Sequence, residues 1–129
     1  RFRNVTGVQT CALPISLVAI RGRRYHGAKT DTGNFWHSIP TIHTEDLHET
    51  IPLDCVPVAV ELLDSSIDLT SYVHPKRAYY IFGPEDGTLG KAVTSWCRDV
   101  IRIPSRYCLN LAACVNVVLY DRMSKEIAR

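Results

Sequence analysis

The run Val56–Leu63 limits the fold of this chain most strongly, because it is nearly all apolar and partly β-branched. A strand of that composition suits a sheet whose two faces are both covered. A second apolar run, Arg77–Phe82, follows it, and segments of helical character lie between and after such runs. Strands that alternate with helices predict an α/β fold with a mainly parallel sheet.

The last expected helix, Leu109–Lys125, is apolar on two sides, which predicts burial on two sides. One side can pack on the sheet, and the other either meets a second subunit or lies deeper in the same core. Before it, Arg21–Phe35 is predicted to be a loop because it is rich in Gly and polar residues. The other expected elements are the strands Leu17–Ile20, Thr41–His43 and Asp99–Ile103, the last with Arg102 facing outward, and the helices Glu45–Ile51, with Thr44 as its N-cap, and Leu89–Cys97.

The first sixteen residues are expected to be foreign to the domain. Val5–Ser16 looks like the in-frame translation of a sequencing adapter, and such segments are set aside before a fold is considered. A signal peptide does not fit, because Gln9, Thr10 and Pro14 interrupt any continuous apolar segment. We therefore expect one domain over residues 17–129.

The charge balance argues against a strongly basic protein. The chain has 15 Lys and Arg against 13 Asp and Glu. Arg1 and Arg3 belong to the adapter-like segment, which has no acidic residue, so the expected domain carries 13 of each sign. A nucleic-acid contact would then depend on local clustering of positive charge.

The cysteines and histidines predict neither a metal site nor a disulfide framework. Cys55, Cys97, Cys108 and Cys114 contain no Cys-x-x-Cys pair, and the histidines lack the spacing of metal ligands. No run approaches the roughly 20 apolar residues of a membrane helix. We expect a cytoplasmic protein with reduced thiols and no membrane segment.

The loop Gly83–Gly87 follows an expected strand and precedes an expected helix. By itself it fits an acidic turn at a helix start about as well as a binding loop. A phosphate loop is disfavoured, because two carboxylates repel phosphate and Lys91 is not placed like a Walker lysine.

Together with the segments after it, this loop resembles motifs 2 and 3 of the SpoU/TrmH class of SPOUT RNA methyltransferases. Phe82–Glu85, with Gly87 and Leu89 close behind, is similar to motif 2. Motif 3 is matched by Ile103–Pro104, Leu109–Asn110 and Leu119–Tyr120, with Cys108 in place of the usual Ser. The similarity spans Ala78–Met123, and two ordered motifs are more specific than either loop alone.

The resemblance implies an α/β knot, a deep trefoil in which the C-terminal segment threads through a loop. It implies S-adenosylmethionine as the cofactor, a homodimer formed through the C-terminal helix, and methylation of a ribose 2′-hydroxyl in tRNA or rRNA. The cofactor would lie at strand ends, where α/β sheets bind ligands. The residues implied to hold it are Val60, Glu61, Gly83, Pro84, Ile103, Cys108 and Leu109.

Glu85 and Asn110 match family positions near the reacting centre. We expect Glu85 to organise the site rather than to act as the base. We expect Asn110 to act in the site, with a hydrogen-bonding role at the start of the last helix as the alternative. The family's motif 1, an Asn-rich segment with an Arg, has no counterpart in this chain. We therefore expect cofactor binding with impaired catalysis.

A second candidate region combines positive charge with an aromatic ring. Arginines bind phosphates and aromatic rings stack on bases, so this region favours RNA contact over a merely solvated loop. Its residues are Arg21, Arg23, Arg24, Tyr25, His26 and Lys29. The alternative to an enzyme is a non-catalytic α/β module that binds RNA or a nucleotide.

Overall fold

The structure of the chain is a computed structural model that describes residues 5–11, 15–22, 37, 39–84 and 87–129, with the backbone alone for residues 5–11, 15 and 16. The described strands form one sheet in the order β3-β2-β1-β6-β4-β7-β5. Their bounds are β1 Val5–Cys11, β2 Ile15–Arg21, β3 Thr41–Thr44, β4 Val56–Val60, β5 Ile67–Asp68, β6 Arg77–Phe82 and β7 Asp99–Arg102.

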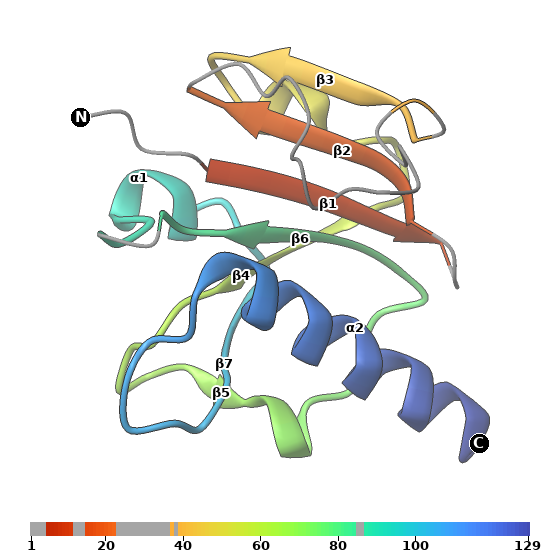
Figure 1. Cartoon of the computed structure of the whole chain (residues 1–129), viewed down its shortest axis with the longest axis vertical. Coiled ribbons are helices and arrows are strands. Elements are labelled where there is room, and N and C mark those ends of the chain that lie inside the picture. Colours follow the sequence, from red (N-terminus) through yellow and green to blue (C-terminus); the bar gives the residue numbers. More distant parts are fainter. Residues whose placement is uncertain (1–4, 12–14, 23–36, 38, 85–86) are drawn as a thin grey trace.

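Most neighbouring strands run parallel, namely β2 with β3, β4 with both β6 and β7, and β5 with β7. Only β1, among the described strands, is antiparallel to its neighbours. The helices are α1 (Lys91–Thr94) and α2 (Leu111–Ile127), with 3₁₀ turns η2 (His48–Thr50) and η3 (Leu69–Ser71). Figure 1 shows α2 crossing one face of the sheet. The expected α/β class and mainly parallel sheet are therefore confirmed.

Residues 1–16, expected to be foreign to the domain, supply β1 and the first residues of β2. Thr6 pairs with Ile20 on one side and with Phe82 on the other. Strand β1 therefore joins the β2–β3 pair to the strands around the core. The domain boundary at residue 17 stays a prediction.

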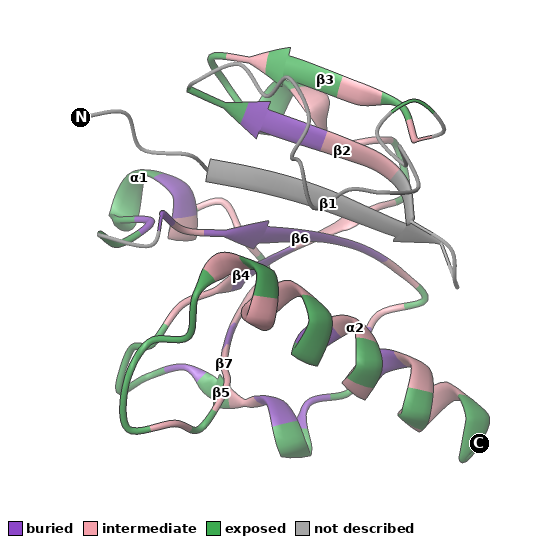
Figure 2. Cartoon of the chain, in the orientation of Figure 1, coloured by how far each residue is buried: buried purple, intermediate pink, exposed green. Residues whose placement is uncertain are grey.

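The core has two halves because β6 is buried on both faces. Ala78, Tyr80 and Phe82 point to the half covered by α2, while Tyr79 and Ile81 point to the half that includes Leu47 and Val93. Successive side chains of a strand face opposite sides of a sheet, so an all-apolar strand fits only where both sides are packed. Figure 2 shows β6 as the buried centre of the molecule.

Two expected helices are shorter in the structure. Where Glu45–Ile51 was expected to be helical, only His48–Thr50 forms a 3₁₀ turn, and Ile51 is extended because Pro52 follows it. Thr44 accepts a hydrogen bond from the Asp46 N–H instead of capping a full helix.

The expected helix Leu89–Cys97 is reduced to α1 because Gly90 has φ 75°, which is incompatible with a helix. The long run Val56–Leu63 likewise ends as a strand at Val60, beyond which Leu63 and Ser66 form turns. By contrast, β6 has the predicted bounds. The short β5 and η3 were not predicted.

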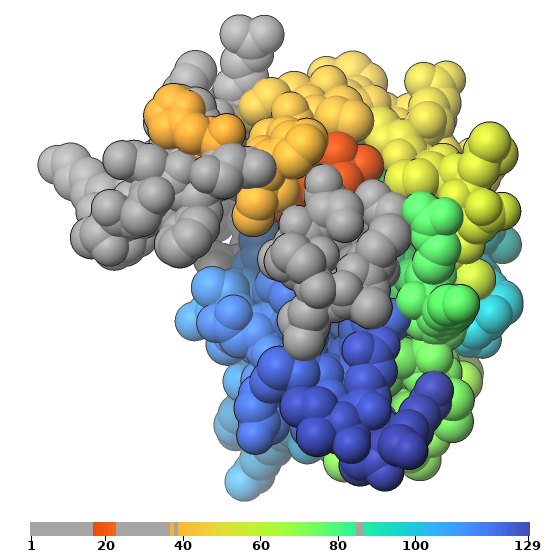
Figure 3. Space-filling model, turned by 90° about the vertical axis from the view of Figure 1, so that its right-hand side faces the viewer, coloured from red at the N-terminus to blue at the C-terminus, as the bar shows by residue number. Residues whose placement is uncertain are grey.

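Helix α2 presents one apolar face to the core and another to solvent. Val118 is fully buried, and Leu111, Val115 and Leu119 pack beside it. The opposite face carries Val117 and Tyr120, which are 38% and 67% exposed in the single chain. In Figure 3 the last turns of α2, in dark blue, form part of the lower surface.

Candidate functional site

A pocket lies at one edge of the sheet, where the parallel strands β4, β6 and β7 end side by side. The carboxyl ends of parallel strands and their loops are the usual place for ligands in α/β proteins. The start of α2 closes one side of the pocket. Its lining residues are Val60, Glu61, Leu62, Phe82, Gly83, Pro84, Gly87, Arg102, Ile103, Ser105, Cys108, Leu109, Leu111 and Cys114.

The pocket is mostly apolar and its enclosed part is small. Its volume is about 80 Å³, below the roughly 300–1,000 Å³ of pockets that enclose a whole drug-sized ligand. A cofactor-sized molecule would therefore extend past the exposed rim at Cys108 and Leu109. The site as described suits a ligand that inserts one group and leaves the rest outside.

Glu61 places a carboxylate in this pocket by bridging two loops. Its Oε1 atom accepts a hydrogen bond from the Leu62 N–H at 3.0 Å, and its Oε2 atom accepts one from the Leu89 N–H at 2.8 Å. The backbone of Glu61 is held as well, because its N–H donates to Ile101 O at 2.9 Å. The carboxylate therefore has a fixed position between the end of β4 and the loop after β6.

Gly83 lies where these two loops approach each other. A Cβ atom there would lie 3.4 Å from Leu89 Cγ and 3.6 Å from Glu61 Oε2. Both distances are ordinary contacts, and the φ of Gly83 is not positive. A side chain as small as alanine would therefore be accommodated at this position.

Arg102 also lines the pocket, which corrects the expectation that it faces outward. Its Nε atom forms an ion pair with Asp68, and Nη1 donates to Leu63 O at 3.3 Å. Its guanidinium thus holds the turn after β4 against β5. The side chain is 30% exposed, so it forms part of the wall without projecting freely into solvent.

Two thiols approach the pocket from the start of α2. Cys114 is half-buried, and burial is the main cause that raises the pKa of its thiol, with the charges of Cys108 and Glu61 adding to the effect. Cys108 is exposed at the rim. Neither thiol forms a disulfide with a described residue, and both belong to the lining.

Asn110 is the N-cap of α2 and does not line the pocket. Its Oδ1 atom accepts a hydrogen bond from the Ala113 N–H at 2.8 Å. An N-cap oxygen of this kind satisfies one of the free donors at a helix start. The structure thus assigns Asn110 the capping role, which the sequence left open beside a catalytic one.

The seven residues implied to hold the cofactor all line this one pocket, although they come from three separate segments of the chain. Arg21 is exposed at the end of β2. Thr44 and Val5 flank it, and Val5 precedes Thr6, the partner of Phe82, so Arg21 lies at the same edge of the sheet. Outside the described residues lie Glu85, Arg23, Arg24, Tyr25, His26 and Lys29.

The sequence did not point to Leu62, Phe82, Gly87, Arg102, Ser105, Leu111 and Cys114 as lining residues. Phe82 and Gly87 belong to the matched motif and could have been named with it. Arg102 carried a usable signal too, because it is the charged residue directly before Ile103–Pro104. Cys114 lines the pocket only because of the way α2 is rotated about its own axis. No local sequence pattern predicts that rotation.

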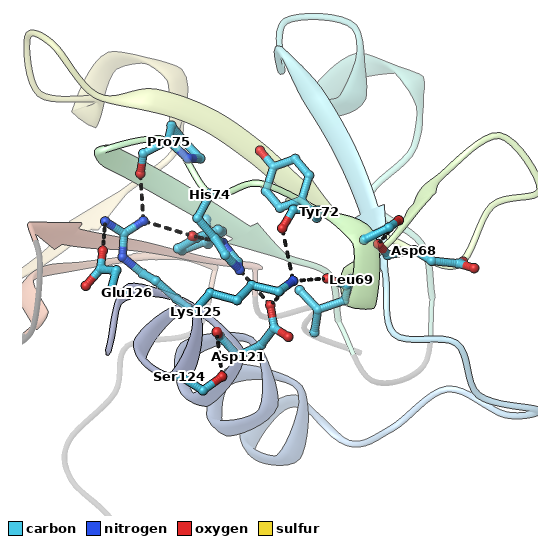
Figure 4. A network of polar contacts seen from close by, with 12 residues as sticks. Asp68, Leu69, Tyr72, His74, Pro75, Asp121, Ser124, Lys125 and Glu126 are labelled. Carbon is cyan, nitrogen blue, oxygen red and sulfur yellow. Dashed lines mark hydrogen bonds and ion pairs between the residues drawn. The ribbon is translucent and has the colours of Figure 1, made fainter. Parts of the chain in front are cut away.

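A second polar cluster, also unforeseen, ties α2 to the segment before β6 (Figure 4). His74, only 7% exposed, lies 2.6 Å from the Tyr80 hydroxyl and 2.8 Å from Asp121 Oδ2. Arg122, 1% exposed, donates to Pro75 O at 2.7 Å and to Lys76 O at 2.8 Å. These contacts stay inside the protein and away from the pocket at the strand ends.

Lys125 extends this cluster toward η3. Its ammonium group donates to Leu69 O at 2.6 Å and to Tyr72 O at 3.0 Å, and it pairs with Asp121. Carbonyls of a connecting segment are thus satisfied by side chains of α2, as buried backbone groups require. The cluster therefore has a structural role, because it holds α2 against the segment between η3 and β6.

Within the described part of the chain, no cluster of three or more His, Cys, Asp or Glu side chains is arranged to hold a metal ion. None of the helices described here has the length and apolar character to cross a membrane. No model of a known protein family matches the chain, and no curated protein matches it either. The family resemblance therefore rests on the motifs themselves.

Proposed function

We propose that this chain carries the cofactor-binding part of an S-adenosylmethionine-dependent methyltransferase that acts on a ribose 2′-hydroxyl of tRNA or rRNA. The observation that carries the proposal is the meeting of the two matched motifs with the end of β4 around one pocket. The ends of parallel strands share an edge in any such sheet, so the support lies in the matched residues of three segments lining a single pocket.

The donor and acceptor set of the pocket fits this cofactor. Apolar walls such as Val60, Ile103 and Leu109 suit an adenine ring. The Glu61 carboxylate suits hydroxyl donors and the positive charge of a sulfonium, and it opposes a polyphosphate. When bound, the cofactor supplies an electrophilic methyl group.

The residues of this chain would bind and orient the cofactor. Proton transfer would fall to other groups. The ribose hydroxyl has to be held in line with the methyl group and relieved of its proton. Glu85, beside the pocket residue Pro84 in sequence, is proposed to organise the loop. Asn110 acts there at most in addition to its capping bond. The Arg of motif 1 is missing, so we expect binding without turnover.

The RNA would approach the same edge of the sheet. Arg21 lies there, and the basic residues that follow it in sequence complete the proposed RNA contact: Arg23, Arg24, Tyr25, His26 and Lys29. Positive side chains beside a pocket would hold the phosphates of the substrate strand. The proposal includes a cytoplasmic setting, which suits the free thiols.

The family's knot and dimer belong to this proposal. The exposed stripe of α2 borders a broad groove that includes Thr70, Pro104, Val117 and Tyr120. In the proposed homodimer, this stripe and groove meet a second copy of the chain. The proposed knot is formed where the segment before α2 passes beside the loop after β6.

Calorimetric titration of the full chain with S-adenosylmethionine tests the proposal. We expect a dissociation constant between about 1 µM and 1 mM, the usual range for enzyme substrates, and no binding of ATP. Absence of binding at millimolar cofactor would contradict the proposal. Tight binding of ATP would favour the alternative, a non-catalytic nucleotide-binding module.

Transfer is tested separately, with the coding segment upstream of the adapter-like residues restored. The restored protein should move labelled methyl groups from the cofactor to bulk tRNA or rRNA, whereas the chain described here should not. Binding by both proteins without transfer by either would refute the enzyme and leave the binding module.

A further inference from the structure

Glu61 and Arg102 are the two charged residues among those that line the pocket. Arg102 is engaged by Asp68. Glu61 forms no ion pair with any residue that the structure describes, and its contacts are the backbone N–H groups of Leu62 and Leu89. The pocket thus contains one carboxylate that neutral donors hold in place.

Contacts with the residues that the structure describes use only half of the hydrogen-bonding capacity of this carboxylate. An ionised carboxylate accepts hydrogen bonds at about four lone-pair sites and donates none. Oε1 and Oε2 each accept one N–H, which leaves about one site on each oxygen. The free sites call for two hydroxyl or amine donors that are spaced like the two oxygens.

A vicinal diol has that spacing, and the ribose of a nucleoside presents one at its 2′ and 3′ positions. An acidic side chain at the end of a strand reads this diol in other α/β nucleotide sites. The fixed carboxylate makes the contact without prior ordering, which preserves affinity. We propose that Glu61 recognises the 2′,3′-diol of the nucleoside part of the ligand, an inference that rests on the proposed function.

This assignment makes Glu61 a specificity-determining residue. A carboxylate that receives two ribose hydroxyls rejects a deoxynucleoside, because one acceptor site loses its donor on binding. It also rejects a ribose that bears a phosphate at the 2′ or 3′ position, since two anions would meet. The pocket would therefore select ribonucleosides with a free diol.

The test compares adenosine, 2′-deoxyadenosine and 3′-deoxyadenosine by calorimetry with the full chain. Each deoxy compound should bind about tenfold or more weakly than adenosine, as the loss of a hydrogen bond to a charged group predicts. Equal binding of the three compounds would overturn the assignment. Glu61 would then either contact a positive charge of the ligand or make no contact with it.

The variant Glu61→Gln should reduce the preference for adenosine, because the amide nitrogen no longer accepts and the remaining acceptor oxygen is uncharged. The exposed Glu45→Gln is the matched control and should keep the full preference. The ratio of two ligands within one variant is insensitive to a general weakening of the loop. Full discrimination by Glu61→Gln would refute the role of the side chain.

The outcomes separate this inference from the proposed function. Binding of S-adenosylmethionine without discrimination between adenosine and its deoxy forms refutes the diol contact alone. Discrimination among the nucleosides without binding of S-adenosylmethionine refutes the methyl-donor pocket alone. If none of these compounds binds, both fall.

Discussion

The Nδ1 atom of His74 lies 2.6 Å from the hydroxyl oxygen of Tyr80, inside the core beneath α2. The other ring nitrogen faces Asp121 Oδ2 at 2.8 Å. A carboxylate only accepts, so Nε2 carries the proton of the neutral ring and Nδ1 accepts from Tyr80. The Tyr80 oxygen in turn accepts from Arg122 Nη1 at 3.2 Å. A neutral His74 therefore completes this chain of hydrogen bonds.

The pKa of His74 is lowered from its ordinary value of 6.5, mainly by burial. The Asp121 carboxylate opposes the shift, while the charges of Lys125 and Arg122 reinforce it. The unfolded chain thus binds the proton more tightly than the folded chain. The stabilisation is fully present above about pH 6.5 and is lost as the pH falls through the lowered pKa.

The first prediction concerns this pH dependence. Urea unfolding between about pH 8 and pH 5 measures how the free energy of unfolding changes with pH. His74 contributes a slope of at most about 1.4 kcal/mol per pH unit, and the variant His74→Gln should lose this contribution. The exposed His43→Gln serves as the control and should retain it. The same slope in the wild type and in His74→Gln would show that another group titrates.

The second prediction concerns Arg122, whose guanidinium forks onto two carbonyls and pairs with Glu126 at 3.0 Å. Arg122→Leu should lower the free energy of unfolding by about 3–5 kcal/mol, because buried acceptors lose their donor. Arg122→Lys should lose less but remain destabilised, since an ammonium cannot reproduce the fork.

Urea denaturation followed by circular dichroism measures these changes. Arg106→Lys, at an exposed position, should stay within about 0.5 kcal/mol of the wild type. A neutral effect of Arg122→Leu would mean that apolar packing compensates for the lost contacts.

The third prediction separates the two roles considered for Asn110. Asn110→Ala should cost about 1 kcal/mol of stability through loss of the cap, and Asn110→Ser should recover most of it. In the restored enzyme, a catalytic role would show as lost methyl transfer in the stable Ser variant. Asn116→Ala, on the exposed face of α2, is the control and should not destabilise. Unchanged stability in Asn110→Ala would contradict the cap.

The fourth prediction orders the thiols by reactivity. Burial raises the pKa of the Cys97 thiol to about 11, so at pH 8 only about one molecule in a thousand carries its thiolate. Cys108 is exposed and should be alkylated by iodoacetamide well before Cys97 and the half-buried Cys114. Peptide mass mapping over time measures the order.

Saturating S-adenosylmethionine should slow the labelling of Cys108, which lines the proposed pocket, and leave Cys97 unchanged. Cys108→Ser identifies the peptide that carries the fast label. Labelling of Cys97 at the rate of Cys108 would show that the segment after α1 opens.

Local sequence was sufficient where a strong pattern met clear boundaries. Strand β6 has its predicted bounds because an apolar run lies between Pro75 and the Gly83–Pro84 pair. Prediction from local sequence failed where one backbone conformation overrode the pattern. The positive φ of Gly90 makes α1 begin only at Lys91. Strand β5 is too short to show any period.

The family resemblance implied that Gly83, Ile103 and Leu109 share one site, and in the structure all three line one pocket. Side chains that act across the chain were beyond the reach of that reasoning. Glu61 reaches Leu89 across 28 positions, and His74 reaches Asp121 across 47. Such contacts depend on strand order and on the rotation of α2, which local patterns do not encode.

The sequence by itself determined the α/β class and the bounds of β6, since burial and turn chemistry act over a few residues. The segments that meet at the pocket were implied by the family resemblance alone. Only the tertiary structure decided that Glu61 lines the pocket and accepts from Leu62 and Leu89, that Asn110 caps α2 and that a buried His74 links Tyr80 to Asp121. Each of these facts depends on which distant groups are close enough to donate or accept a hydrogen bond.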